Sequence, residues 1–195
     1  MLRDPHARER AAVIRLFDVL FSAVGLILGA PLLLLLTFIG LLDTGSPLFR
    51  QVRVGRDQKP FTLWKFRTMR RDTASVATHL ASRSSITRFG HFLRRTKLDE
   101  LPQLWNVLKG EMSLVGPRPG LFNQEELTRE RALREVFKVR PGITGLAQIS
   151  EIDMSTPELL AKTDQRMLQH LTLRAYFKYI VLTISGKGAG DRING

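Results

Sequence analysis

A long uncharged segment, residues 19–42, constrains the fold of this chain more than any other feature of the sequence. It holds a block of leucines at 32–36 and, near its middle, Pro31. About 20 consecutive apolar residues are enough for a helix to cross the hydrocarbon core of a bilayer. The segment therefore predicts a membrane-inserted helix. Residues 11–18 are expected to form its amphipathic start, with Arg15 reaching the lipid head groups.

Basic residues flank this segment on both sides. Residues 1–18 hold four arginines, and residues 43–71 hold eight lysines and arginines. Because cytoplasmic flanks are enriched in Lys and Arg, both ends are expected in the cytoplasm. A helix that enters and leaves through one leaflet satisfies both flanks. Pro31 is its expected bend, because proline removes one intrahelical hydrogen bond. A single-pass helix with a proline kink is the alternative, and a cleaved secretory signal fits the segment less well.

The composition narrows the classes of function. The chain has no cysteine, which excludes disulfides, zinc fingers and thiol nucleophiles. Its formal net charge of +12 indicates a polyanionic neighbour such as nucleic acid, anionic lipid or a phosphorylated substrate. A nucleic-acid-binding protein would need stacking aromatics in a basic groove, and the chain has 2 Trp and 2 Tyr and no such motif. We therefore expect no nucleic-acid partner. A non-catalytic membrane scaffold is the other alternative class.

Beyond the apolar segment, the pattern is that of a folded domain. Residues 48–54 and 61–66 alternate as strands do, and the turn at 55–57 joins them into a predicted hairpin. The polar stretch 70–90 predicts a mobile loop and then a short helix.

Two further helices are expected towards the C-terminus. The charged stretch 119–136 predicts an amphipathic helix with a Glu130–Arg134 pair. Residues 168–182 mix aromatics, leucines and basic residues, which suits a helix in the membrane interface or, equally, a core helix.

A pair of neighbouring acids opens the predicted helix at 96–110. Pro102 is tolerated only in the first turn of a helix, so Asp99 or its neighbour is expected to be the N-cap. Asp99 and Glu100 would then lie at the positive end of the helix dipole. The apolar face of this helix would comprise Leu98, Leu101, Leu104, Trp105 and Leu108. A capping acid beside a second helix-stabilising acid is the structural alternative to a catalytic pair.

Two loops rich in proline and glycine, at 112–119 and 138–145, favour a catalytic role of Asp99 and Glu100 over a purely structural one. Each loop presents an arginine, Arg118 or Arg140, from a backbone with little freedom. A guanidinium group in a fixed frame suits bidentate capture of a phosphate group. The sequence therefore predicts an anion site near the two acids.

Four strings of residues carry a resemblance to a known family. They are KFRTM at 65–69, LDELPQLWNVLKG at 98–110, MSLVGPRP at 112–119 and RPGITGLAQ at 140–148. Together they closely resemble the bacterial sugar transferases, the monotopic phosphoglycosyl transferases, and the resemblance runs from about residue 15 to 183. It is to the small form of that family.

The resemblance implies an enzyme that moves a sugar-1-phosphate from a UDP-sugar to polyprenyl (undecaprenyl) phosphate, releases UMP and starts a bacterial glycan. It implies Asp99 as the nucleophile, Glu100 as a ligand of Mg²⁺ and Arg118 as a contact to the nucleotide. Lys65 and Arg67 would belong to the basic cluster of the active site. With Arg140 they are expected to bind substrate, and a solvated or lipid-facing charge is the alternative for each of these three.

Two positions depart from the usual pattern of the family. Glu111 stands where an Asp is common, which is a mild change, and the stretch 150–157 replaces the usual Asn-Gly-Arg continuation. The identity of the sugar is left open by this second departure.

These inferences combine into one expected architecture. The fold class is α+β and helix-rich, with a re-entrant membrane helix hairpin at 1–43 and a compact cytoplasmic α/β catalytic domain at 44–185. That domain would hold a small β-hairpin and interfacial amphipathic helices, and residues 186–195 would be a flexible tail. The expected location is the cytoplasmic face of the bacterial inner membrane, in contact with phospholipids. A homo-oligomer is left open.

Overall fold

The computed structural model describes residues 5–73 and 85–188, and its fold is α+β and rich in helix, as the sequence predicts. In chain order the elements are α1 (Pro5–Thr44), β1 (Leu48–Val54), η1 (Arg56–Gln58), β2 (Pro60–Phe66), α2 (Arg88–Thr96), η4 (Leu98–Glu100), α3 (Gln103–Leu108), β3 (Ser113–Val115), α4 (Glu125–Leu133), η5 (Val136–Lys138), β4 (Gly142–Thr144), α5 (Leu146–Ile149), α6 (Pro157–Gln169) and α7 (Leu173–Ile184).

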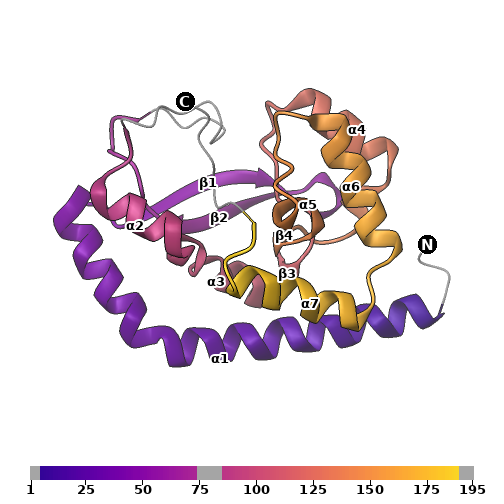
Figure 1. Cartoon of the computed structure of the whole chain (residues 1–195), viewed down its shortest axis with the longest axis horizontal. Coiled ribbons are helices and arrows are strands. Elements are labelled where there is room, and N and C mark those ends of the chain that lie inside the picture. Colours follow the sequence, from indigo (N-terminus) through magenta and orange to yellow (C-terminus); the bar gives the residue numbers. More distant parts are fainter. Residues whose placement is uncertain (1–4, 74–84, 189–195) are drawn as a thin grey trace.

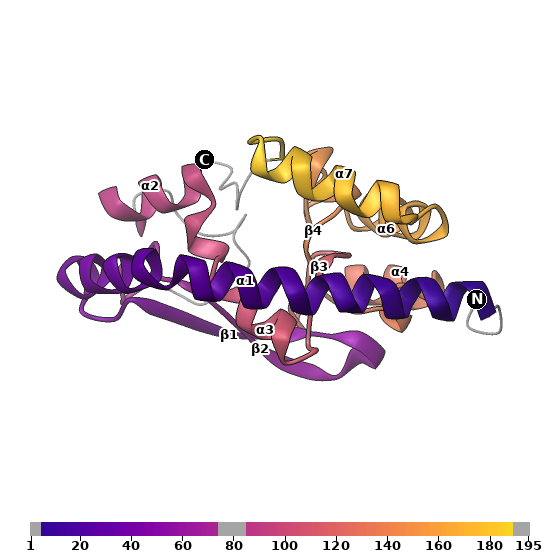
Figure 2. The same ribbon diagram turned by 90° about the horizontal axis from the view of Figure 1, so that it is seen from below.

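Helix α1 runs along one side of the molecule, and the other elements all lie to the same side of this helix (Figures 1 and 2). Strands β1 and β2 form the predicted antiparallel hairpin, with Phe49 opposite Lys65. Strands β3 and β4 pair in parallel, which brings the two loops rich in proline and glycine side by side. Their contact requires glycine, because a Cβ on Gly142 would lie 2.0 Å from the backbone nitrogen of Gly116.

The long helix α1 is continuous, and Pro31 lies inside it. The predicted bend at Pro31 therefore does not divide α1 into two helices, and the re-entrant course through a membrane stays a prediction. Figure 1 shows its C-terminal part turning up towards α2. Proline removes a single hydrogen bond, so the helix continues through the bend on the bonds that remain. Among the described residues, α1 alone is long and apolar enough to cross a membrane, and its most apolar window is mostly exposed.

Small apolar clusters join α1 to the rest of the fold. Towards its C-terminal end, Leu36 packs with Phe66 of β2 and Leu93 of α2. Towards its N-terminal end, Ile14 and Phe17 pack against the cluster that contains Tyr176 of α7 and Val115 of β3. Both ends of the apolar helix are thus fixed to one folded unit.

Several predicted boundaries shift. The helix expected at 119–136 is α4, which starts later because residues 119–124 form a loop, and its predicted Glu130–Arg134 ion pair is present at 2.5 Å. The stretch 168–182 spans the end of α6 and most of α7, since Thr172 caps a new helix there. The short helix predicted within 70–90 begins at Arg88, whereas 74–84 and the tail from 189 lie outside the described residues.

Candidate active site

The two acids lie on a tight turn between α2 and α3. Lys97 has a left-handed backbone (φ 58°) that ends α2, and the 3₁₀ turn η4 follows directly. Asp99 is buried within this turn and Glu100 lies at its end. The prediction that Asp99 or its neighbour caps the helix is wrong. The N-cap of α3 is Pro102, and the one-turn displacement arises because η4 closes with its own i→i+3 hydrogen bonds.

The predicted apolar face of this helix is also only partly correct. The side chains that α3 buries are Gln103, Asn106 and Val107, whereas Trp105 is about half exposed. Asn106 explains the difference, because both the nitrogen and the oxygen of its side chain are hydrogen-bonded to the backbone of β2. Its amide nitrogen donates to the carbonyl of Thr62 (2.7 Å), and its oxygen accepts from the backbone N–H of Trp64 (3.1 Å). The polar side chain of Asn106 therefore lies on the buried face of α3, where the spacing of apolar residues predicts leucines.

Arg118 meets the acidic pair as expected. Its Nη2 lies 3.0 Å from Oε1 of Glu100, and both side chains are largely shielded from solvent. Lys97 also belongs to this cluster. Burial lowers the pKa of Lys97, while the charge of Glu100 raises it and that of Arg118 lowers it. Two cations thus lie near the carboxylate of Glu100, next to Asp99 in the chain, in an arrangement suited to an anionic substrate.

The loop that carries Arg118 is held at successive carbonyl groups. The carbonyl of Pro117 accepts from the N–H of Gly142 (2.9 Å), and that of Arg118 itself accepts from Arg131 Nη1 (2.8 Å). The carbonyl of Pro119 accepts from Arg53 Nη1 (3.1 Å). Three separate elements therefore fix the backbone from which the guanidinium group of Arg118 extends.

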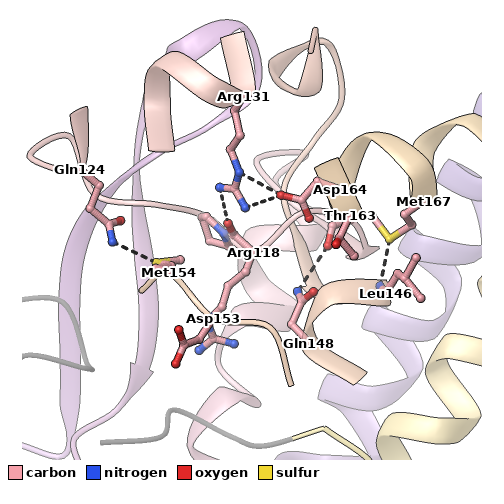
Figure 3. A network of polar contacts seen from close by, with 12 residues as sticks. Arg118, Gln124, Arg131, Leu146, Gln148, Asp153, Met154, Thr163, Asp164 and Met167 are labelled. Atoms are coloured by element: carbon pink, nitrogen blue, oxygen red, sulfur yellow. Dashed lines mark hydrogen bonds and ion pairs between the residues drawn. The ribbon is translucent and has the colours of Figure 1, made fainter. Parts of the chain in front are cut away.

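Arg131 is in turn fixed by Asp164. Its Nε and Nη2 donate to Oδ2 of Asp164 at 3.0 and 2.7 Å, and both side chains are fully buried (Figure 3). Burial raises the pKa of Asp164, and the charge of Arg131 opposes that rise. The sequence predicts an amphipathic helix that contains Arg131, and it does not predict this pair. No local signal in the sequence joins two residues on different helices.

The structure places Arg140 elsewhere. Its Nε donates to the carbonyl of Gly110 (2.8 Å), beyond the C-terminal end of α3, whereas the acids precede the N-terminal end. Burial, followed by the charges of Arg15 and Arg56, lowers the pKa of Arg140. The prediction that it binds substrate beside Asp99 is not supported by this position. The physical reason is that the exposed carbonyls at a helix end attract guanidinium groups.

Arg15 of α1 corrects another expectation. It does not extend to lipid, because its two terminal nitrogens donate to the carbonyls of Val107 (2.7 Å) and Leu108 (3.0 Å). Nearby on the same helix, Asp18 is fully buried. Its Oδ1 accepts from the hydroxyl of Tyr176 (2.8 Å) and the backbone N–H of Leu114 (2.9 Å). The charged residues before the apolar run thus hold the helix against the domain.

Lys65 and Arg67 lie together around the ring of Phe49, at 5.7 and 5.5 Å from its centre. Lys65 is buried on β2, the strand that packs against η4. Arg67 donates to the carbonyl of Ser46 (3.0 Å), so part of its role is to hold the turn before β1. The strand that carries Lys65 therefore borders the acidic turn.

Comparison with known proteins identifies the family to which the chain belongs. The family model of the bacterial sugar transferases matches residues 9–187. The chain belongs to this family. A UDP-glucose:undecaprenyl-phosphate glucose-1-phosphate transferase of Klebsiella pneumoniae is 46% identical over 141 residues, which cover 70% of the chain and 30% of that protein. The chain therefore spans about a third of this longer relative.

Two shorter relatives are covered more fully. An uncharacterized sugar transferase of Bacillus subtilis (strain 168) is 46% identical over 138 residues, covering 70% of the chain and 67% of the relative. An exopolysaccharide production protein of Rhizobium leguminosarum bv. phaseoli is 44% identical over 146 residues, covering 69% of the chain and 72% of the relative.

Proposed function

We propose that this protein transfers a sugar-1-phosphate from a UDP-sugar to undecaprenyl phosphate and releases UMP. The family and the names of the relatives from Klebsiella, Escherichia coli and Caulobacter support this reaction class. The observation that carries the proposal is the buried turn with Asp99 and Glu100, whose second acid meets Arg118 at 3.0 Å. A diphosphate needs such cations, because its negative charge repels any anionic nucleophile.

In the proposed first step, a carboxylate oxygen of Asp99 attacks the β-phosphorus of the UDP-sugar. The bond from that phosphorus to the oxygen bridging the two phosphates breaks, and UMP leaves with this oxygen. Asp99 then carries the sugar phosphate as an acyl phosphate. In the second step a phosphate oxygen of undecaprenyl phosphate attacks the same phosphorus, and the carboxylate of Asp99 is regenerated. A covalent intermediate allows the soluble product to leave before the lipid arrives.

The neighbouring side chains have distinct proposed roles. Arg118 binds a phosphate oxygen of the donor, and the loop contacts described above keep its backbone in place during the reaction. Lys97 adds positive charge beside Glu100, and its side chain is anchored by donating to the carbonyl of Lys187 (2.6 Å). Lys65 extends the positive field from β2. We propose no contact to substrate for Arg140.

The described residues fit a Mg²⁺ ion whose coordination is completed by oxygen atoms of the substrate. They contain no cluster of three or more acids or histidines, but Glu100 offers hard carboxylate oxygens next to the reacting group. Mg²⁺ is commonly bound by one or two carboxylates together with substrate phosphates and water. When bound, it would neutralise charge on the diphosphate. We propose Glu100 as its protein ligand.

We propose that α1 enters and leaves one leaflet, with the catalytic domain at the cytoplasmic face of the inner membrane. The support is that residues on both sides of the apolar run bind the same folded domain. Arg15 bonds to the end of α3 before the run, and Asp43 accepts from Thr87 (2.7 Å) after it. A straight span would place these two flanks on opposite sides of the membrane, where one domain does not reach both.

The covalent step provides the test. Wild-type protein incubated with a UDP-sugar alone, from a panel of hexose and N-acetylhexosamine donors, is expected to release UMP in amounts equal to the enzyme. The peptide containing Asp99 should gain the mass of a sugar phosphate. Asp99→Asn should abolish both signals, and it lowers turnover by at least about 1000-fold because the nucleophile is gone. UMP release only after undecaprenyl phosphate is added would contradict the intermediate.

A further inference from the structure

A second basic site lies at the C-terminal end of α1, apart from the acidic pair. It is an open pocket of about 590 Å³, large enough for a small organic ligand. Residues from three parts of the chain line it: Asp43 and Thr44 at the end of α1, Arg70 and Arg71 after β2, and Ile86, Thr87 and Arg88 at the start of α2.

Backbone contacts build the walls of this pocket. Met69 and Ile86 form an antiparallel bridge, and the N–H of Thr87 donates to the carbonyl of Thr68 (3.1 Å). The hydroxyl of Thr87 donates to Oδ2 of Asp43 (2.7 Å), which ties α2 to the end of α1. The relative positions of the three segments are therefore set by hydrogen bonds.

The lining of the pocket is strongly positive. Arg70, Arg71 and Arg88 are all exposed, and within residues 5–73 and 85–188 none of their guanidinium groups makes an ion pair. Among the described residues of the lining, Asp43 is the one acid, and its Oδ2 accepts a hydrogen bond from the hydroxyl of Thr87. Three guanidinium groups in one pocket favour an anion with several oxygens, such as a phosphate.

The surface next to the pocket is apolar. Phe38, Leu41 and Leu42, in the last turns of α1 before Asp43, are 60%, 48% and 73% exposed. A phosphate group attached to an acyl chain matches both surfaces at once. We infer that this pocket binds the head group of an anionic phospholipid, with its acyl chain along the end of α1. This inference rests on the proposed placement of α1 in one leaflet.

The position of the pocket distinguishes this lipid from the acceptor substrate. The pocket lies at the N-terminal end of α2, and the turn with Asp99 follows the C-terminal end. A helix of nine residues is about 13 Å long, so a phosphate in the pocket is too far from Asp99 to react with it. The site suits a lipid that holds the protein at the membrane surface.

Competition between two lipids tests the inference. The purified full-length protein in detergent is mixed with equal amounts of phosphatidylglycerol and phosphatidylcholine of the same chain length. Native mass spectrometry then gives the ratio of the bound lipids. We expect the wild type to prefer phosphatidylglycerol. The variant Arg70→Gln/Arg71→Gln/Arg88→Gln should lose at least about fivefold of that preference, because each basic residue near a membrane contributes about this factor.

A matched control removes the same charge elsewhere. Lys59, Arg129 and Arg166 are exposed and line neither the pocket nor the acidic turn. The variant Lys59→Gln/Arg129→Gln/Arg166→Gln is therefore expected to keep the wild-type ratio. An equal ratio in the wild type, or equal loss in both triple variants, would overturn the inference.

Two further measurements separate the alternatives. If an equal amount of undecaprenyl phosphate displaces phosphatidylglycerol from the wild type, the pocket belongs to the acceptor and the inference is wrong. UMP release from a UDP-sugar in detergent is expected to be the same for the wild type and the pocket variant. Absence of UMP release from the wild type would contradict the proposed reaction and leave the lipid ratio as an independent result.

Discussion

The backbone of Arg118 is positioned by Arg131, which is itself neutralised by Asp164. Arg131→Met leaves a buried carboxylate without its partner, so the free energy of unfolding in urea should fall by about 3–5 kcal/mol. The double variant Arg131→Met/Asp164→Leu should regain most of that stability, because no buried charge remains. Its kcat/KM should nevertheless stay low, since the carbonyl of Arg118 has lost its donor. Wild-type kcat/KM in a stable double variant would show that Arg131 does not position Arg118.

The proposed role of Glu100 as a ligand predicts that activity requires Mg²⁺. Turnover should vanish in excess EDTA and return when Mg²⁺ is added, since hard oxygen ligands are what this turn offers. Glu100→Gln should raise the Mg²⁺ concentration needed for half-maximal rate by at least about tenfold, because the amide is a weaker ligand. Glu111→Gln is a control with the same chemical change, on a side chain that instead accepts from Asn106 and Lys109. Undiminished turnover in EDTA would contradict a metal requirement.

Arg118 and Arg140 should also differ in their effects when substituted. Arg140→Gln removes a hydrogen bond to Gly110 and is expected to cost about 1–2 kcal/mol of stability while leaving the KM for the UDP-sugar unchanged. Arg118→Gln should lower kcat/KM by about 10- to 100-fold with little loss of stability. Urea denaturation and initial rates measure the two effects separately. A raised KM in a fully folded Arg140→Gln protein would return Arg140 to the substrate site.

At the scale of the elements, we expect the bend of α1 to depend on Pro31. Pro31→Leu restores the missing backbone N–H, so the helix should straighten. Straightening pulls the C-terminal part, with Leu36, away from Phe66 and Leu93, and we expect lower activity in membranes. Leu34→Ile is the matched control, because it changes an exposed apolar side chain of the same helix and leaves Pro31 in place. Limited proteolysis of membrane vesicles measures the change, and an unaltered pattern with full activity for Pro31→Leu would contradict a role of the bend.

For the whole molecule, the contacts of both flanks with one domain predict the topology. Cysteines introduced as Arg8→Cys and Lys59→Cys lie on opposite sides of the apolar run, and the natural chain has no cysteine to interfere. Both should resist an impermeant thiol reagent in intact cells and react after the cells are permeabilised. Labelling of only one in intact cells would demonstrate a spanning helix and would overturn the proposed placement in one leaflet.

The sequence by itself determined the elements that depend on neighbouring residues. The uncharged run 19–42 predicts a long apolar helix, alternation at 48–54 and 61–66 predicts the hairpin, and the Glu130–Arg134 pair follows from helical spacing. The identity of the acidic pair at Asp99 also came from the sequence, through a long motif that resembles a family. In each case the information lies within a few residues or within one continuous string.

Only the tertiary structure decided where the long basic side chains go. Arg15, expected at the lipid surface, reaches the carbonyls of Val107 and Leu108, which lie 92 and 93 residues along the chain. Arg131 meets Asp164 across 33 residues. A guanidinium group on a flexible stem binds whichever carbonyl or carboxylate the packed elements bring within reach. Periodicity specifies which face of a helix a residue occupies, and only packing specifies what lies opposite that face.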